Sequence, residues 1–154
     1  MSAPRKTKQS MTGQHYQQEI ENLKQKLNEA RRMMINLLPR EVAIISRNFL
    51  RDFTINKNDM AFDDLVDKLI EHAKLSAFPG AGYITDEIRA YCPLCGSGCQ
   101  GPYDKGFRLP GGMQRHFFGH GNLTQCGTMA VLITMAHDLR RELQAGNSIG
   151  LLLY

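Results

Sequence analysis

A set of cysteines and histidines between Tyr91 and Cys126 constrains this chain more than any other feature of its sequence. Cys92 and Cys95 form a C-x2-C pair, and His116 follows after twenty intervening residues. Thiolate and imidazole are the ligands that zinc takes in a tetrahedral arrangement, and a site filled by four protein ligands leaves no open position for a substrate. The spacing therefore predicts one structural zinc ion per chain.

Two residues compete for the fourth ligand position, namely His120 and Cys126. Gly119 is a residue type that commonly ends helices, so a helix carrying His116 is expected to stop at Phe118 and to leave His120 off its metal-facing side. Cys126 lies just before the last expected helix, whose N-terminal dipole favours a thiolate. We therefore favour Cys126 over His120, with both kept as candidates.

Other interpretations of the cysteines are a redox disulfide and plain coincidence. A disulfide between Cys92 and Cys95 would leave His116 unexplained and lacks the βαβ setting of such motifs. The cysteines and histidines could also be free thiols and surface side chains, although the spacing argues against this. Cys99 is expected to be a bystander.

Part of this region resembles the two-Cys two-His zinc finger over about thirty residues, on Cys92, Cys95, Phe107, Met113, His116 and His120. The loop before the helix is longer than in that family, and glycines flank His120. The resemblance implies that the base-facing helix positions fall on Leu109, Gly112 and Arg115, of which only Arg115 could read a base. The stretch from His116 to Cys126 is also weakly similar to small zinc-binding accessory proteins of phages and mobile elements.

The rest of the chain is predicted to be mainly α-helical. Residues 1–13 are polar and form an expected disordered basic arm, and residues 14–38 form an expected coiled-coil-like helix. Apolar residues recur in this helix three and four positions apart, at Ile20, Leu23, Leu27, Ala30, Met34 and Leu37. Such a seam fits a homodimer through Ile20, Leu23, Leu27, Met34 and Leu37, or a helix hairpin within one chain.

Residues 39–77 are predicted to form a helical pair. Pro39 interrupts the first helix, and apolar residues then follow at helical spacing at Val42, Ile45, Phe49 and Phe53. A further helix is expected from about Asn58 or Asp59. Residues 78–146 are predicted to be a zinc-binding module with a short strand near Phe107, a helix that begins at Pro110, and a C-terminal helix from Thr128 to Leu143. Residues 147–154 form an apolar tail.

Charge is unevenly distributed along the sequence. Residues 1–40 contain eight Lys and Arg against three Glu, which makes this the most basic part of the chain. Arg5, Lys6 and Lys8 are therefore candidate nucleic-acid contacts together with Arg115. The alternative is a solvated arm. No secretory signal or membrane-spanning run is apparent, so a cytoplasmic protein without membrane association is expected.

These features favour a small regulatory protein that holds structural zinc and associates with nucleic acid, mainly through charge. The alternative is a zinc-stapled interaction or adaptor module that dimerises through the N-terminal helix. An enzyme is not expected, because the sequence contains no nucleophile elbow, Walker loop or H-E-x-x-H motif. The order of Glu71 and His72 also differs from the H-x-E of zinc deaminases.

Overall fold

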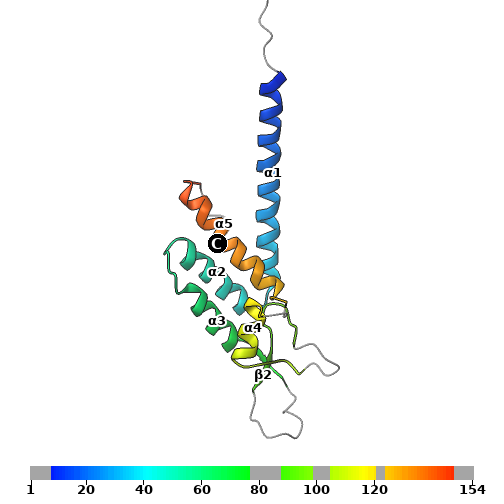
Figure 1. Cartoon of the computed structure of the whole chain (residues 1–154), viewed down its shortest axis with the longest axis vertical. Helices are drawn as coiled ribbons and strands as arrows, with labels where there is room; N and C mark the ends of the chain where they lie inside the picture. The colour runs from blue at the N-terminus through cyan, green and yellow to red at the C-terminus, as the bar shows by residue number, and fades with distance from the viewer. Residues whose placement is uncertain (1–7, 77–87, 99–104, 121–123, 148–154) are drawn as a thin grey trace, which may run out of the picture. The chain divides into compact units, whose positions relative to one another are not determined.

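The computed structural model describes residues 8–76, 88–98, 105–120 and 124–147, and it divides the chain into two compact units, Met1–Met34 and Ile35–Tyr154. Five helices and three short strands make up the described part (Figure 1). The expectation of a mainly α-helical protein is confirmed. The first seven residues, residues 77–87, Cys99 and the tail from residue 148 lie outside the described ranges.

The first unit consists of most of helix α1, which spans Lys8–Leu37. It begins at Lys8, before Gln14, the predicted start. Residues 8–13 contain no Pro, and extending an existing helix costs much less free energy than starting one. The seam residues Ile20, Leu23 and Leu27 are exposed along it. Whether they contact another chain remains a prediction.

Helix α2, Arg40–Thr54, starts after Pro39. Pro39 has no N–H to donate, and its carbonyl accepts the first bond of the new helix, from the Ala43 amide at 2.8 Å. The four predicted core positions of this helix are all buried, which confirms the sequence-based periodicity: Val42, Ile45, Phe49 and Phe53.

Helix α3 spans Ala61–Glu71 and helix α5 spans Gly127–Gln144. Both pack against α2, and the three helices form the apolar core of the second unit (Figure 1). Leu65 and Leu69 of α3 are fully buried, as are Leu132 and Met135 of α5. No side chain caps α3; instead the Asn58 side chain accepts a hydrogen bond from the Met60 amide just before the helix.

A small antiparallel sheet with strand order β1-β2-β3 follows this helical core. Its strands are β1, Lys74–Leu75, β2, Arg89–Tyr91, and β3, Phe107–Arg108. Ala90 of β2 pairs with Leu75 on one side and with Phe107 on the other. The strand predicted near Phe107 is present, whereas β1 was not predicted from the sequence.

Helix α4, Gly111–Phe118, comes directly after β3 and contacts both β3 and α5. Pro110 occupies its N-cap position, close to the predicted start. Among the helices that the structure describes, none combines the length and the apolar character needed to cross a membrane. The sheet, α4 and the start of α5 together position the side chains of the candidate site.

Candidate metal centre

The first two cysteines of the site lie in a tight loop after β2. Cys92 follows directly on Tyr91, and the Gly96 amide donates a hydrogen bond to the Cys92 carbonyl at 2.8 Å. The Cys92 amide in turn donates to the Ser97 carbonyl at 2.9 Å. Gly96 has a φ of +72°, a conformation that a residue without a side chain adopts at no steric cost. These bonds bring the two sulfurs of a C-x2-C pair to the same side of the loop.

His116 is supplied by the last turn of α4. Its imidazole stacks on the Phe107 ring of β3, with the ring centroids 4.2 Å apart and the planes inclined by 16°. This contact orients the imidazole, whose Nε2 lies 3.3 Å from the Cys95 Sγ. The aromatic side chain in the strand therefore orients the histidine.

Cys126 enters the site from the N-cap position of α5. Its amide donates to the His116 carbonyl at 2.8 Å, so the segment before α5 is fixed directly to α4. Its side chain is buried, and its Sγ lies 3.9 Å from the Sγ of Cys92. This separation rules out a disulfide in this structure, because two bonded sulfurs lie about 2.05 Å apart.

The ligand atoms of Cys92, Cys95, His116 and Cys126 all lie within 4.8 Å of one another. Sulfurs placed about 2.3 Å from a tetrahedral zinc ion are separated by roughly 3.8 Å, close to the spacing found here. All three cysteines of this group are free thiols. The residues thus form a Cys3His group that is compatible with a zinc site, whereas the Cys92–Cys95 disulfide interpretation is not supported.

The thiols of Cys92 and Cys126 shift each other's pKa in opposite directions. The hydrogen bond from the Cys92 thiol lowers the pKa of Cys126 to about 5, and the Met129 amide at the start of α5 and the nearby His116 act in the same direction. The same hydrogen bond, together with burial, raises the pKa of Cys92 well above its ordinary range. The two sulfurs therefore do not both favour the thiolate form on their own, and a bound cation would stabilise both as thiolates.

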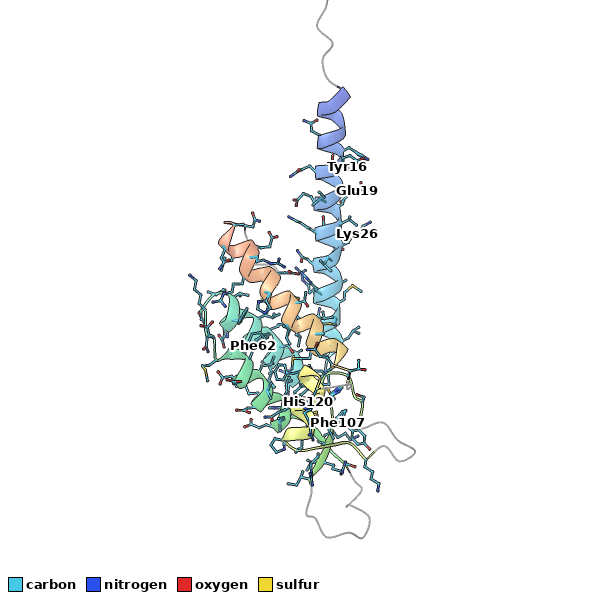
Figure 2. All side chains as sticks on the ribbon, viewed as in Figure 1. Tyr16, Glu19, Lys26, Phe62, Phe107 and His120 are labelled. Atoms are coloured by element: carbon cyan, nitrogen blue, oxygen red, sulfur yellow. The ribbon has the colours of Figure 1, made fainter. Side chains whose placement is uncertain are left out.

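His120, the other candidate for the fourth ligand, is not part of this group. Helix α4 ends at Phe118, and Gly119 follows with a φ of +74°, so the prediction that this glycine stops the helix is confirmed. His120 is exposed beyond this stop (Figure 2). Among the residues that the structure describes, the cluster of metal-ligand atoms contains Cys126 instead.

The predicted nucleic-acid contacts are placed less completely. Arg115 is exposed on α4, one turn after Gly112. Arg5 and Lys6 lie outside the described residues, and Lys8 is the first residue of α1. The base-facing positions implied by the zinc-finger resemblance are not reproduced on one helix, because Leu109 precedes α4 and donates its amide to the Ile88 carbonyl.

Some contributors to the site were missed by sequence reasoning. The Ser97 Oγ lies 2.8 Å from the Cys95 Sγ, within hydrogen-bond distance. Ser97 stands two residues after Cys95, in the glycine-rich exit from the loop, and this position is the signal that could have identified it. Arg89 and Arg108 are direct cross-strand partners next to the site, a pairing that only the register of β2 and β3 reveals.

Comparison with known proteins finds no family model, no curated protein and no solved structure that matches this chain.

Proposed function

We propose that this protein holds a structural zinc ion at Cys92, Cys95, His116 and Cys126, and that the module built around the ion associates with nucleic acid mainly through charge. Four protein ligands complete the tetrahedral coordination of a zinc ion and leave no coordination position for a substrate, which supports a structural role for the ion. The ligands come from the β2 loop, α4 and α5, so the ion would join three separate parts of the chain.

The resemblance to the two-Cys two-His finger then extends to three ligands and the supporting aromatic residue. Cys92, Cys95 and His116 occupy the corresponding places, and Phe107 packs on the histidine. We propose that Cys126 takes the role of the second histidine because Gly119 ends α4 before His120. The module is thus a finger-like variant whose fourth ligand starts the next helix.

The observation that carries the nucleic-acid proposal is the placement of the arginines of this module. Residues 86–120 contain four basic residues, Arg89, Lys105, Arg108 and Arg115, against three acidic ones, Asp86, Glu87 and Asp104, a net charge of +1 without the histidines. The charge count along the chain is therefore nearly balanced. The proposal depends instead on where the sheet brings the arginines together.

The sheet register concentrates this charge. Arg89 and Arg108 are opposite one another on β2 and β3, so their side chains share one face of the sheet. The Arg89 guanidinium donates a hydrogen bond to the Gly106 carbonyl at 3.2 Å. A phosphate group that approached this face of the sheet would meet both arginines. A Cβ built on Gly112 lies 3.2 Å from the Cβ of Arg108, so α4 brings Arg115, one turn further on, to the same side.

The basic N-terminal residues Arg5, Lys6 and Lys8 extend this proposal as additional phosphate contacts. Such contacts carry no sequence information by themselves, and one exposed arginine on α4 is a weak reader of bases. We therefore propose a regulatory protein with little intrinsic sequence preference. Its free thiols fit a reducing compartment such as the cytoplasm.

A zinc-stapled adaptor is the second candidate function. The observation that favours it is the exposed apolar seam of α1, where Leu23 is 59% exposed. In that case the metal module would be a structural staple, and the interacting surface would be α1.

Salt-dependent binding of the zinc-loaded protein to duplex and single-stranded oligonucleotides, measured by fluorescence anisotropy, separates the two candidates. Each phosphate contact contributes a slope in log affinity against log salt of about −0.9 on duplex DNA and about −0.7 on single strands, so Arg108→Gln combined with Arg115→Gln should flatten the slope by up to about two contacts. The control, Lys57→Gln combined with Lys68→Gln, removes the same charge from α3 and the turn before it and should leave the slope unchanged. Absence of binding at near-physiological salt would favour the adaptor.

A further inference from the structure

Between Gly13 and Ala30, helix α1 presents an apolar stripe whose side chains are exposed in the part of the chain that the structure describes. Tyr16, Ile20, Leu23 and Leu27 are between 49% and 60% exposed. They follow the 3.5-residue spacing that keeps a narrow seam against a partner helix. Helices usually gain most of their stability by packing such a stripe, so this one requires a partner helix.

The charged residues beside the stripe distinguish between the ways in which two copies of α1 could pair. With Ile20 and Leu27 at a positions and Leu23 at d, Glu19 and Lys26 occupy g positions, and Lys24 and Arg31 occupy e positions. All four flank the seam, and Figure 2 marks Glu19 and Lys26 along the helix together with Tyr16.

A parallel dimer would gain little from these charges. Residues at g face residues at the following e position of the partner, so Glu19 would meet Lys24 while Lys26 would meet Arg31. The first contact is attractive and the second is repulsive. In addition, Lys24 already contacts Glu21 of its own helix at 3.7 Å.

In antiparallel pairs, g faces g and e faces e. A register that layers Leu23 against Leu27 places Lys24 opposite Lys24 and Lys26 opposite Lys26, which is repulsive. A register that layers Ile20 against Leu23 instead places Glu19 opposite Lys26 twice, and only the uncharged Gln17 opposite Lys24. The same register sets Tyr16 against Leu27 and the small Gly13 against the small Ala30.

We propose that α1 pairs with α1 of a second copy as an antiparallel coiled coil, in the register that layers Ile20 on Leu23 and pairs Glu19 with Lys26. It is the one arrangement of the three in which every charge contact is attractive. The proposal rests on α1 alone and holds whether or not the metal module binds nucleic acid.

The antiparallel pairing would place the ends of α1 that lead into the second units far apart. Met34 of one copy would lie opposite residue 9 of the other, so the two Met34 residues would be about 37 Å apart along the coil at 1.5 Å per residue. The second units would therefore be attached at opposite ends of the coil. A parallel dimer would attach both at the same end.

Charge reversal tests the pairing, with the dimer dissociation constant measured by sedimentation of nuclease-treated full-length protein at low salt. Lys26→Glu should weaken the antiparallel dimer about tenfold, because two attractive pairs become repulsive. Glu19→Lys should do the same, and the double variant should recover the original affinity. Arg32→Glu, on the outer face, is the matched control and should have little effect. Leu27→Lys should give a monomer.

The measured dissociation constants distinguish an antiparallel dimer from a parallel dimer and from a monomer. A monomeric unaltered protein at tens of micromolar would overturn the proposal, and so would a double variant that fails to recover. In a parallel dimer Lys26→Glu would face Arg31 and would tighten association instead of weakening it. Circular dichroism of each variant shows whether the second unit is still folded, so that a loss of association can be assigned to α1.

Discussion

At the scale of single residues, the metal centre depends on side chains held from three directions. Cys92→Ser and Cys126→Ser should each release zinc, because loss of one thiolate leaves the four-ligand site with only three protein ligands. His120→Ala should retain it, since His120 lies beyond the stop at Gly119. Metal content of purified variants by native mass spectrometry checks this. Zinc loss in His120→Ala with retention in Cys126→Ser would restore the two-Cys two-His arrangement.

Three glycines near the site should respond differently to alanine. Gly106 has a φ of +79°, and a Cβ there would lie 2.8 Å from the Ala90 carbonyl oxygen, so both strain and a backbone clash oppose it. Gly96 has a positive φ but open space, so only the backbone cost of roughly 1–2 kcal/mol applies. Gly111 has neither problem and should tolerate alanine. Thermal unfolding should therefore rank Gly106→Ala below Gly96→Ala and Gly111→Ala highest in stability.

At the scale of elements, the core of the second unit is formed by α2, α3 and α5. Leu50 of α2 is completely buried, so Leu50→Ala should cost about 2–5 kcal/mol through lost burial and the remaining cavity. Ile44 on the same helix is 44% exposed, and Ile44→Ala should cost far less. Urea unfolding of the two variants measures the difference. Equal losses would mean that the exposed face of α2 is covered in solution.

The elements also differ in how far the sequence determines them. The repeat of Val42, Ile45 and Phe49 identifies α2, because the 3.6-residue period is contained in one short segment and places all three side chains on the buried face. Strands β1 and β2 have two or three residues each, too few to show alternation, and the partner of β1 is far away in sequence. Such strands exist only through non-local pairing, which composition does not reveal.

The same contrast applies within the site. The Cys92 and Cys95 pair is legible from spacing, and Gly119 correctly indicates where α4 ends. The Phe107 contact with His116 and the pairing of Arg89 with Arg108 depend on strand register, which one sequence does not specify. The ligand residues can therefore be predicted from the sequence, whereas the contacts between strands and helices that orient them cannot.

At the scale of the whole second unit, the proposed ion and the apolar core should stabilise different regions. The candidate ligands connect the β2 loop, α4 and the first residue before α5, while Leu65, Leu69 and Leu132 bury their side chains among α2, α3 and α5. Metal binding at such a site contributes directly to folding free energy. Removal of zinc should consequently affect the two regions unequally.

Hydrogen exchange before and after chelation measures this difference. The amides of Cys92, Gly96 and Cys126, which are bonded within the loop or to α4, should lose most of their protection when zinc is removed. Amides in the middle of α2 and α3 should remain protected, because the apolar core still excludes water there. Cys92→Ser without added metal should reproduce the chelated pattern, and His120→Ala should not. Uniform loss of protection over all helices would instead show that the ion and the core unfold as one cooperative unit.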